Sequence, residues 1–188
     1  MNNIGEKLTK EDRKNLYRVF MKNTTKTNSH LYNLVEKLDR IGFFTAPAST
    51  KYHGAYEGGL FDHSLQVARE LVRLTDKLNL KWQRPESPYI VGMFHDLCKV
   101  DNYKKDLETD SYIYNPYKIL DGHGEKSVIV LQGYISLTAE EIACIRWHMG
   151  AFETDTNKWK YYGNAIKAYP NVLYTHTADI TASHIRGV

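Results

Sequence analysis

Residues 91–100 read VGMFHDLCKV and place a histidine and an aspartate, His95 and Asp96, at the end of an apolar run. This run predicts a short, nearly all-apolar helix over residues 89–98 that is buried in the protein. An ionised carboxylate buried without a partner is costly, so such a group is normally paired, neutralised or bound to a metal. The rest of the sequence has to show which of these applies to Asp96.

Hydrophobic residues recur at helical spacing along most of the chain. The predicted helices cover residues 10–22, 28–41, 60–80, 89–98, 124–134, 138–149, 164–168 and 172–186. Residues 101–121 differ, because aromatic and aliphatic residues alternate over 112–114 after a polar turn at 108–110, which predicts a β-hairpin. A polar, aromatic loop is expected over 151–162. The sequence therefore predicts an all-α fold, a helical bundle with one small β-hairpin insertion.

The composition is that of an ordinary single globular domain, with 188 residues of which 42% are hydrophobic and 25% are charged. We expect one domain over residues 1–188, with N-terminal helices over 1–45 and the hairpin insertion over 101–121. The net charge of +3 suits a phosphorylated substrate, but it is far from the dense basic face of a dedicated nucleic-acid binder. The two cysteines argue against a disulfide framework, and no apolar run has membrane-spanning length, so we expect a cytoplasmic protein.

Some polar residues on or beside the predicted helices are suited to binding a metal. They are His63, His95, Asp96, His123, His148 and Asp179. Imidazole and carboxylate ligands together favour Zn, Mn, Fe, Co or Ni, whereas carboxylate and water alone suit Mg or Ca. Taken singly, each histidine is more often a surface or hydrogen-bonded core residue than a ligand. The spacing permits these side chains to converge on one site, and it does not establish that they do.

Five local motifs resemble those of the HD superfamily, whose members are metal-dependent phosphohydrolases with an all-α core. Segment 58–68 (GGLFDHSLQVA) resembles the helix of the first histidine, 95–99 (HDLCK) the namesake motif, and 175–183 (THTADITAS) the final-aspartate helix. Segments 122–127 (GHGEKS) and 145–150 (IRWHMG) resemble the extra histidine motifs of members that hold two metals. A His-Asp pair alone is weak evidence, but five motifs in the family's order identify the superfamily.

The resemblance implies an HD-domain bundle with a metal-site core over residues 53–183 and a cofactor of divalent transition metal. Two ions of Mn, Fe, Ni, Co or Zn are favoured over Mg. The first metal would be held by His63, His95, Asp96 and Asp179. The second would share Asp96 as a bridge and add His123 and His148. Such a pair can bind a phosphate oxygen and acidify a shared water for in-line attack on phosphorus.

Two further residues are assigned catalytic roles from the resemblance. Lys99 follows Asp96 by one helical turn, so it can share a face with the carboxylate. The family's corresponding lysine lies near the substrate phosphate or the bridging water. His53 lies in a glycine-rich loop where some relatives carry a histidine, and it would contact phosphate or donate a proton to a leaving oxygen, together with Lys51 and Tyr52. The alternatives are a snorkelling surface lysine and an ordinary loop histidine.

Several neighbouring residues have less defined roles. Cys98 stands where the family commonly has glycine, and we expect it to alter packing only. Asp62 and Glu125 are either partners that orient ligand imidazoles or exposed first-turn carboxylates that complement helix dipoles. His176 faces either the same site or the surface, and His184 is expected to be an ordinary histidine without a role in the site.

Substrate specificity must come from residues around the metals. Aromatic side chains of the hairpin, Tyr114 among them, and of the 151–162 loop can stack on a base, which favours a nucleotide substrate. Alternatively, the hairpin tyrosines only pack the hairpin against the core. Lys126 and Arg146 would add positive charge beside the phosphates.

Three functions from different classes are compatible with this sequence. The first is a metal-dependent phosphohydrolase that cleaves a phosphate ester of a nucleotide or a similar small phosphorylated metabolite. The second is a 3′–5′ nuclease or a cyclic-nucleotide phosphodiesterase, although the mild net charge argues against a processive nuclease. The third is a non-enzymatic metal-binding sensor. A sensor would be expected to lack a ligand, and here all the ligand positions are filled.

Overall fold

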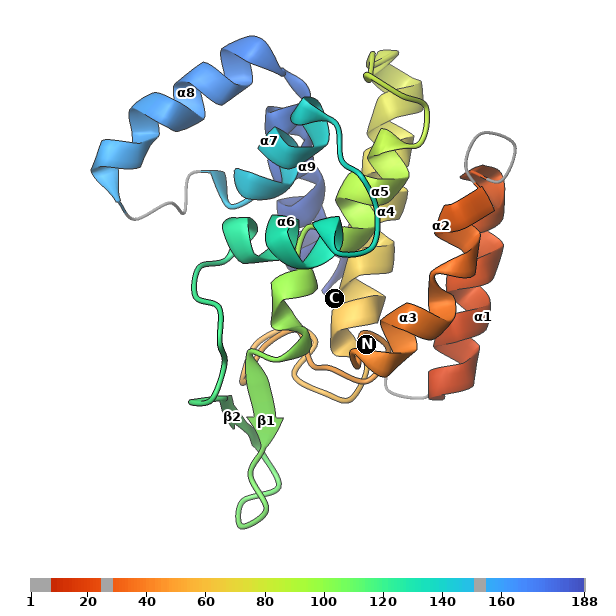
Figure 1. Ribbon diagram of the computed structural model, residues 1–188, viewed down its shortest axis with the longest axis vertical. Coiled ribbons are helices and arrows are strands. Elements are labelled where there is room, and N and C mark those ends of the chain that lie inside the picture. Colours follow the sequence, from red (N-terminus) through yellow and green to blue (C-terminus); the bar gives the residue numbers. More distant parts are fainter. Residues whose placement is uncertain (1–7, 25–28, 151–154, 188) are drawn as a thin grey trace.

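α4 (Gly59–Leu78) and α5 (Ser87–Phe94) are the pair of helices around which the rest of the chain packs. The computed structural model describes residues 8–24, 29–150 and 155–187 (Figure 1). α4 has its most extensive contacts with α5, and α9 (Asn171–Ile180) lies against both. Four apolar side chains of α5 are completely buried, as the sequence predicts: Ile90, Val91, Met93 and Phe94.

Gly92 permits the close approach of α5 to α4. A β-carbon added at Gly92 would collide with the backbone of Ala68 in α4. A larger residue at this position would push the end of α5 outward, together with the His95–Asp96 pair that follows it. The predicted helix over 89–98 is too long, however. α5 ends at Phe94, and the pair occupies a break before the 3₁₀ turn η3 (Leu97–Val100).

The N-terminal helices form one side of the molecule (Figure 1). They are α1 (Lys10–Met21), the 3₁₀ turn η2 (Lys22–Thr24), α2 (Ser29–Asn33) and α3 (Val35–Arg40), so the helix predicted over 28–41 is divided in two. Arg13 of α1 donates hydrogen bonds of 3.0 and 2.9 Å to the two carboxylate oxygens of Asp62 in the first turn of α4. Both side chains are buried. This ion pair attaches the N-terminal helices to the helix that carries His63.

The C-terminal half supplies the other helices. They are α6 (Gly124–Gln132), α7 (Ala139–Arg146), the 3₁₀ turn η5 (Thr156–Lys158), α8 (Trp159–Ala168) and, after α9, the π-helical turn η6 (Thr181–Arg186). The loop predicted over 151–162 is therefore wrong from residue 156 onward, and residues 151–154 lie outside the described part of the chain. α8 forms because Tyr162, Ala165 and Ile166 pack on the core at helical spacing.

The predicted hairpin is confirmed. β1 (Tyr103–Lys105) and β2 (Tyr112–Tyr114) pair antiparallel, with Tyr103 opposite Tyr114. The hairpin projects from the helical body beside the loop that precedes α4 (Figure 1). The protein is thus an all-α bundle with one small hairpin. Within the described ranges, no helix combines the length and the apolar character that a bilayer crossing requires.

Candidate metal centre

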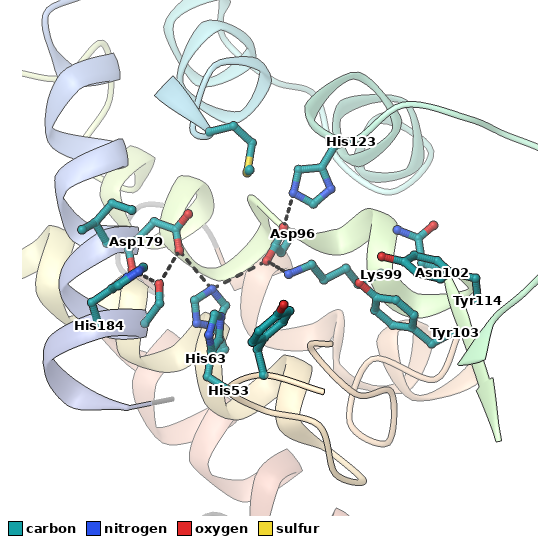
Figure 2. Close-up of a pocket in the computed structure, with 14 residues that line it drawn as sticks. His53, His63, Asp96, Lys99, Asn102, Tyr103, Tyr114, His123, Asp179 and His184 are labelled. Atoms are coloured by element: carbon teal, nitrogen blue, oxygen red, sulfur yellow. Dashed lines mark hydrogen bonds and ion pairs between the residues drawn. The ribbon is translucent and has the colours of Figure 1, made fainter. Parts of the chain in front are cut away.

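The carboxylate of Asp96 lies at the middle of the site, and its two oxygens face different side chains (Figure 2). Its Oδ2 atom lies 3.6 Å from His63 Nε2 and 3.5 Å from His95 Nε2. Its Oδ1 atom lies 3.0 Å from His123 Nε2 and 3.5 Å from His148 Nε2. Asp96 is only 2% exposed. One buried carboxylate therefore lies between two pairs of imidazoles.

Asp179 from α9 lies beside His63 and His95 and forms a first group of possible ligands with them. Its Oδ1 atom lies 3.2 Å from His63 Nε2 and 3.9 Å from His95 Nε2. The Nε2 atoms of His63 and His95 lie 3.2 Å apart. The close packing of α4, α5 and α9 thus brings together three side chains that are far apart in the sequence, and their ligand atoms are near enough to hold one metal ion.

His123 and His148 form the second group. His123 directly precedes α6, and His148 lies just beyond the end of α7. α6 packs against both η3 and α7. A β-carbon added at Gly124 would collide with the backbone of Arg146, so glycine is needed where α6 begins on the end of α7. This contact places both rings on the Oδ1 side of Asp96.

Backbone carbonyls orient two of these imidazoles. His95 Nδ1 lies 2.9 Å from the carbonyl oxygen of Gly92, and His148 Nδ1 lies 2.7 Å from that of Ile145. A carbonyl oxygen only accepts hydrogen bonds, so each Nδ1 carries the proton and donates it. In the neutral ring Nε2 then keeps its lone pair and points toward Asp96. This is the tautomer that a ligand bound through Nε2 requires.

The centre also contains a buried polar atom whose bonding a cation would complete. Within the described part of the chain, no hydrogen bond satisfies His148 Nε2, which lies 3.5 Å from Asp96 Oδ1. Leaving a buried polar atom unsatisfied costs about 1–3 kcal/mol. A cation between imidazole nitrogen and carboxylate oxygen would bind to both, and this mixed donor set suits Mn, Fe, Co, Ni or Zn. The residues present therefore fit a divalent transition metal.

Ionisation in the metal-free centre follows from the same contacts. Burial would raise the pKa of Asp96, but the charge of Lys99 beside it holds that pKa well below the usual range. Burial would likewise raise the pKa of Asp179, but the hydrogen bond from His63 holds it low. Burial alone would lower the pKa of His123, but the negative charge of Asp96 raises it to about 10. Both carboxylates are thus kept in the ionised state that binds cations.

A cavity of about 690 Å³ opens onto this centre (Figure 2). Seven of the predicted site residues line it: Lys99, His53 and Tyr114, and the predicted ligands His63, Asp96, His123 and Asp179. Lys99 Nζ lies 2.7 Å from Asp96 Oδ2. Burial would lower the pKa of Lys99, but the Asp96 charge raises it, so Lys99 is a cation here. The His53 ring lies 5.4 Å from the His63 ring, and burial, with the nearby positive charge, lowers the pKa of His53 to about 4.

Lys126 does not line this cavity, which corrects its prediction as a residue beside the phosphates. Its side chain is 1% exposed, and its ammonium donates to Asp101 Oδ1 and, at 2.9 Å, to Asn102 Oδ1. A buried ammonium with such bonds has a structural role. It holds the turn between η3 and the hairpin.

Arg146 and Lys51 also lie outside the cavity lining. Arg146 forms a 2.6 Å ion pair with Glu125, and its guanidinium lies 4.0 Å from the centre of the Trp147 ring. Lys51 is exposed in the loop before α4. Neither side chain lies where the sequence predicts contact with substrate. Arg146 instead contacts Glu125 and Trp147, and Lys51 is exposed to solvent.

The contacts of Asp62 and His176 show where these two side chains, for which the sequence left two alternatives each, are directed. Asp62 neither orients a ligand imidazole nor lies exposed at the helix start, because Arg13 and the Tyr56 hydroxyl, at 3.1 Å, both bind its carboxylate. His176 directs Nδ1 to the carbonyl oxygen of His148 at 2.8 Å. It therefore supports the backbone of a predicted ligand and is not part of the cavity lining.

The cavity also includes residues to which the sequence assigned no role: Asn102, Met149, Ile180, Ser183 and His184. His184 follows Asp179 by five residues. In an α-helix these two side chains would diverge by roughly 140°. The π-helical turn η6 is wider, and it leaves His184 on the cavity wall close to Asp179 (Figure 2). The sequence carries no pattern that signals this turn, so the place of His184 on the cavity wall could not be predicted from it.

Comparisons with known proteins agree with this geometry. A family model of the HD domain matches residues 60–182. A dihydroneopterin 2′,3′-cyclic phosphate phosphodiesterase from Methanocaldococcus jannaschii is 28% identical over 114 residues, which cover 58% of this chain and 44% of that protein. The chain thus spans less than half the length of that curated relative. No solved structure matches the chain at a comparable level of significance.

Proposed function

This chain belongs to the HD domain family, and on that premise we propose that it is a metal-dependent phosphohydrolase acting on a nucleotide or a similar small phosphorylated molecule. One observation carries the proposal. Asp96 presents one oxygen to His63 and His95 and the other to His123 and His148. A carboxylate in this position suits a bridge between two cations, and such a pair of cations is used to hydrolyse phosphate esters.

The proposed ligands fall into two metal positions. The first metal position consists of His63, His95, Asp96 and Asp179, and the second consists of Asp96, His123 and His148. When bound, divalent cations at these positions supply Lewis acidity for a phosphate oxygen and acidify a water for attack. The role of the protein is to keep the carboxylates ionised and the imidazoles correctly oriented.

Lys99 and His53 are proposed to contact the substrate. Lys99 keeps its positive charge beside Asp96 and lines the cavity, so its ammonium can hold a phosphate oxygen against the metal positions. The lowered pKa of His53 leaves its imidazole neutral at pH 7. A neutral ring at this place suits a hydrogen bond to a phosphate or ester oxygen better than transfer of a proton to the leaving group.

The outer wall of the cavity supports a substrate with a flat ring. Tyr103 and Tyr114 pair across the hairpin with ring centres 5.4 Å apart, and both line the cavity. Tyr114 is 71% exposed, and Tyr52, which lines the same cavity from the loop before α4, is 80% exposed. Exposed aromatic faces beside a phosphate-binding centre can stack on a base, and the cavity volume is within the range of small-ligand sites.

A cyclic phosphodiester is the second candidate substrate, and the curated relative favours it. The name of that relative specifies a 2′,3′-cyclic phosphate of dihydroneopterin. Hydrolysis of such an ester needs the same metal-activated water and the same phosphate contacts. The two candidates would therefore share the metal centre and differ in whether the phosphate is bonded to the molecule through one ester oxygen or through two.

A substrate panel with the metal-loaded protein tests the proposal. The panel comprises chromogenic phosphate monoesters and diesters, mononucleotides, 2′,3′- and 3′,5′-cyclic nucleotides, and single-stranded oligonucleotides. We expect metal-dependent hydrolysis of one small ester class, loss of activity with a chelator, and recovery when metal is restored. Preference for oligonucleotides would favour a nuclease. A fully metal-loaded protein that hydrolyses none of them would contradict the proposal and favour a sensor.

A further inference from the structure

The orientation of His123 depends on a sulfur atom. Its Nδ1 atom lies 3.2 Å from Cys98 Sγ, while its Nε2 atom lies 3.0 Å from Asp96 Oδ1. The thiol and the carboxylate thus lie at different edges of the same ring. Where His95 and His148 have a backbone carbonyl at Nδ1, His123 has the side chain of Cys98.

The position of each histidine relative to a helix end explains why Nδ1 of His123 faces a thiol while Nδ1 of His95 and His148 faces a backbone carbonyl. His95 and His148 follow the ends of α5 and α7, and the last carbonyls of a helix are free to accept hydrogen bonds. His123 directly precedes α6, and the first turn of a helix offers free N–H groups instead. No such carbonyl is therefore available to orient this ring. An acceptor has to come from another element, and Cys98 in η3 provides it.

Cys98 is itself held firmly in place. It is completely buried, and its backbone N–H donates a 3.0 Å hydrogen bond to Ser127 Oγ in α6, the helix that begins beside His123. The side-chain amide of Asn102 approaches Sγ at 3.8 Å. By contrast, the His123 side chain retains 31% of its exposure, whereas the His63, His95 and His148 side chains have at most 1%. His123 is thus the ligand with the least packing to fix it.

We propose that Cys98 is a positioning residue for the second metal position: its sulfur accepts the Nδ1–H hydrogen bond of His123 and so keeps Nε2 directed at Asp96 Oδ1. This inference rests on the two-metal site proposed above. It differs from the sequence-based expectation that Cys98 affects packing only. It also assigns the thiol a role other than direct metal ligation, because Sγ lies at the Nδ1 edge of the ring and the predicted ion at the Nε2 edge.

To test this, metal-free protein is titrated with Co²⁺, and binding of each ion is monitored by calorimetry and by absorption spectroscopy. Wild type is compared with Cys98→Ala, Cys98→Ser and the matched control Cys144→Ala, which removes the other buried thiol of the chain. We expect Cys98→Ala to bind the second ion about 10- to 100-fold more weakly, as is usual when a partner of a ligand histidine is lost. Binding of the first ion should not change. Cys98→Ser should recover part of the lost affinity because its hydroxyl can also accept, and Cys144→Ala should resemble wild type.

The outcomes separate this inference from the metal site itself. Equal affinity of wild type and Cys98→Ala for the second ion would overturn the positioning role and leave the two-metal site intact. A sulfur-to-cobalt charge-transfer band that disappears in Cys98→Ala would show direct ligation and would also overturn it. Wild type that binds no second ion would overturn both proposals. If Cys98→Ala does not fold, the Cys98→Ser variant is used in its place. An affinity at least tenfold lower for both ions in Cys98→Ser would indicate a packing role and overturn the positioning role.

Discussion

His148 Nε2 and Asp96 Oδ1 face each other at 3.5 Å, and within the described ranges no hydrogen bond satisfies the nitrogen. Both are completely or almost completely buried. His148 directs its Nδ1 proton to Ile145, so the lone pair of its other nitrogen meets the lone pair of an ionised oxygen. Two acceptors arranged in this way repel each other unless a cation or a proton lies between them. This relationship is the main support for the proposed second metal position.

Replacing Asp96 by asparagine should remove both metal ions. The amide keeps the size of the side chain but has one oxygen and no charge, so it cannot bridge two cations. We expect hydrolysis to fall by at least about a hundredfold, because bound metals supply several kcal/mol of transition-state stabilisation. Metal content and turnover are measured on the same preparation. The control is Asp76→Asn, an exposed position on α4. Metal-loaded and active Asp96→Asn protein would contradict the assignment.

Removing the charge of Lys99 should slow hydrolysis without emptying the metal positions. Lys99→Met keeps the aliphatic stem that lines the cavity but loses the ammonium that faces Asp96 and is proposed to hold the substrate phosphate. We expect kcat/KM to fall by about a hundredfold, the usual effect of losing one charge-stabilising group. Lys51→Met serves as the control, since Lys51 is exposed and outside the cavity lining. Unchanged kcat/KM in Lys99→Met would remove Lys99 from the mechanism.

Binding of the second ion should release a proton. The pKa of His123 is about 10 in the metal-free protein, so the ring is protonated at pH 7 and must lose that proton from Nε2 before it can bind a cation. Affinity for the second ion should therefore rise with pH, by up to about tenfold per pH unit below this pKa. Calorimetry in buffers of different ionisation enthalpy measures the released protons. In His123→Gln this release should be absent. If the affinity of the wild-type protein for the second ion does not change between pH 6 and pH 8, this prediction is wrong.

The buried Arg13–Asp62 pair should contribute strongly to stability. Arg13→Ala leaves the Asp62 carboxylate buried without its cation, and such losses cost about 3–5 kcal/mol. The free energy of unfolding is measured by urea denaturation at constant pH. Lys10→Ala is the matched control, because the Lys10–Asp39 pair is largely exposed on the lysine side and should contribute about 1 kcal/mol or less. Equal effects of the two substitutions would show that the buried pair has no special role.

The exposed face of Tyr114 should determine part of the substrate affinity. Tyr114→Ala removes one aromatic wall of the cavity, and loss of a stacked base should raise KM by about tenfold. Tyr117→Ala is the control, since Tyr117 is similarly exposed near the same hairpin but does not line the cavity. The measurement uses the best nucleotide-like substrate from the panel. If both variants keep the wild-type KM, the tyrosines serve only to pack the hairpin.

Much of the fold follows from the sequence because helical periodicity is local. The stripe of apolar residues in α4, the apolar run of α5 and the alternation in the hairpin are each visible within a few residues. The helix ends were less predictable. The break at His95–Asp96 and the π-helical turn at η6 depend on packing between distant segments, and neither leaves a pattern in its own residues.

For the site, the types of the candidate ligands could be predicted from the sequence, but their detailed contacts could not. The ligand types and their order suggest the family, and the structure brings all of these side chains together. Spacing alone could not show which oxygen of Asp96 faces which histidine. It also could not reveal that Lys126 is buried against Asp101, or that Cys98 lies against His123, because both contacts join residues 25 positions apart. Such contacts are fixed by tertiary packing.

The most direct test of the two-metal centre is the number of ions bound by purified, metal-saturated protein. Elemental analysis should find two divalent transition-metal ions per chain in wild type and one in His148→Ala, which retains His63, His95, Asp96 and Asp179. Asp96→Ala should retain none. A wild-type protein that binds no transition metal, or an Asp96→Ala variant that still binds two ions, would contradict the central role of Asp96.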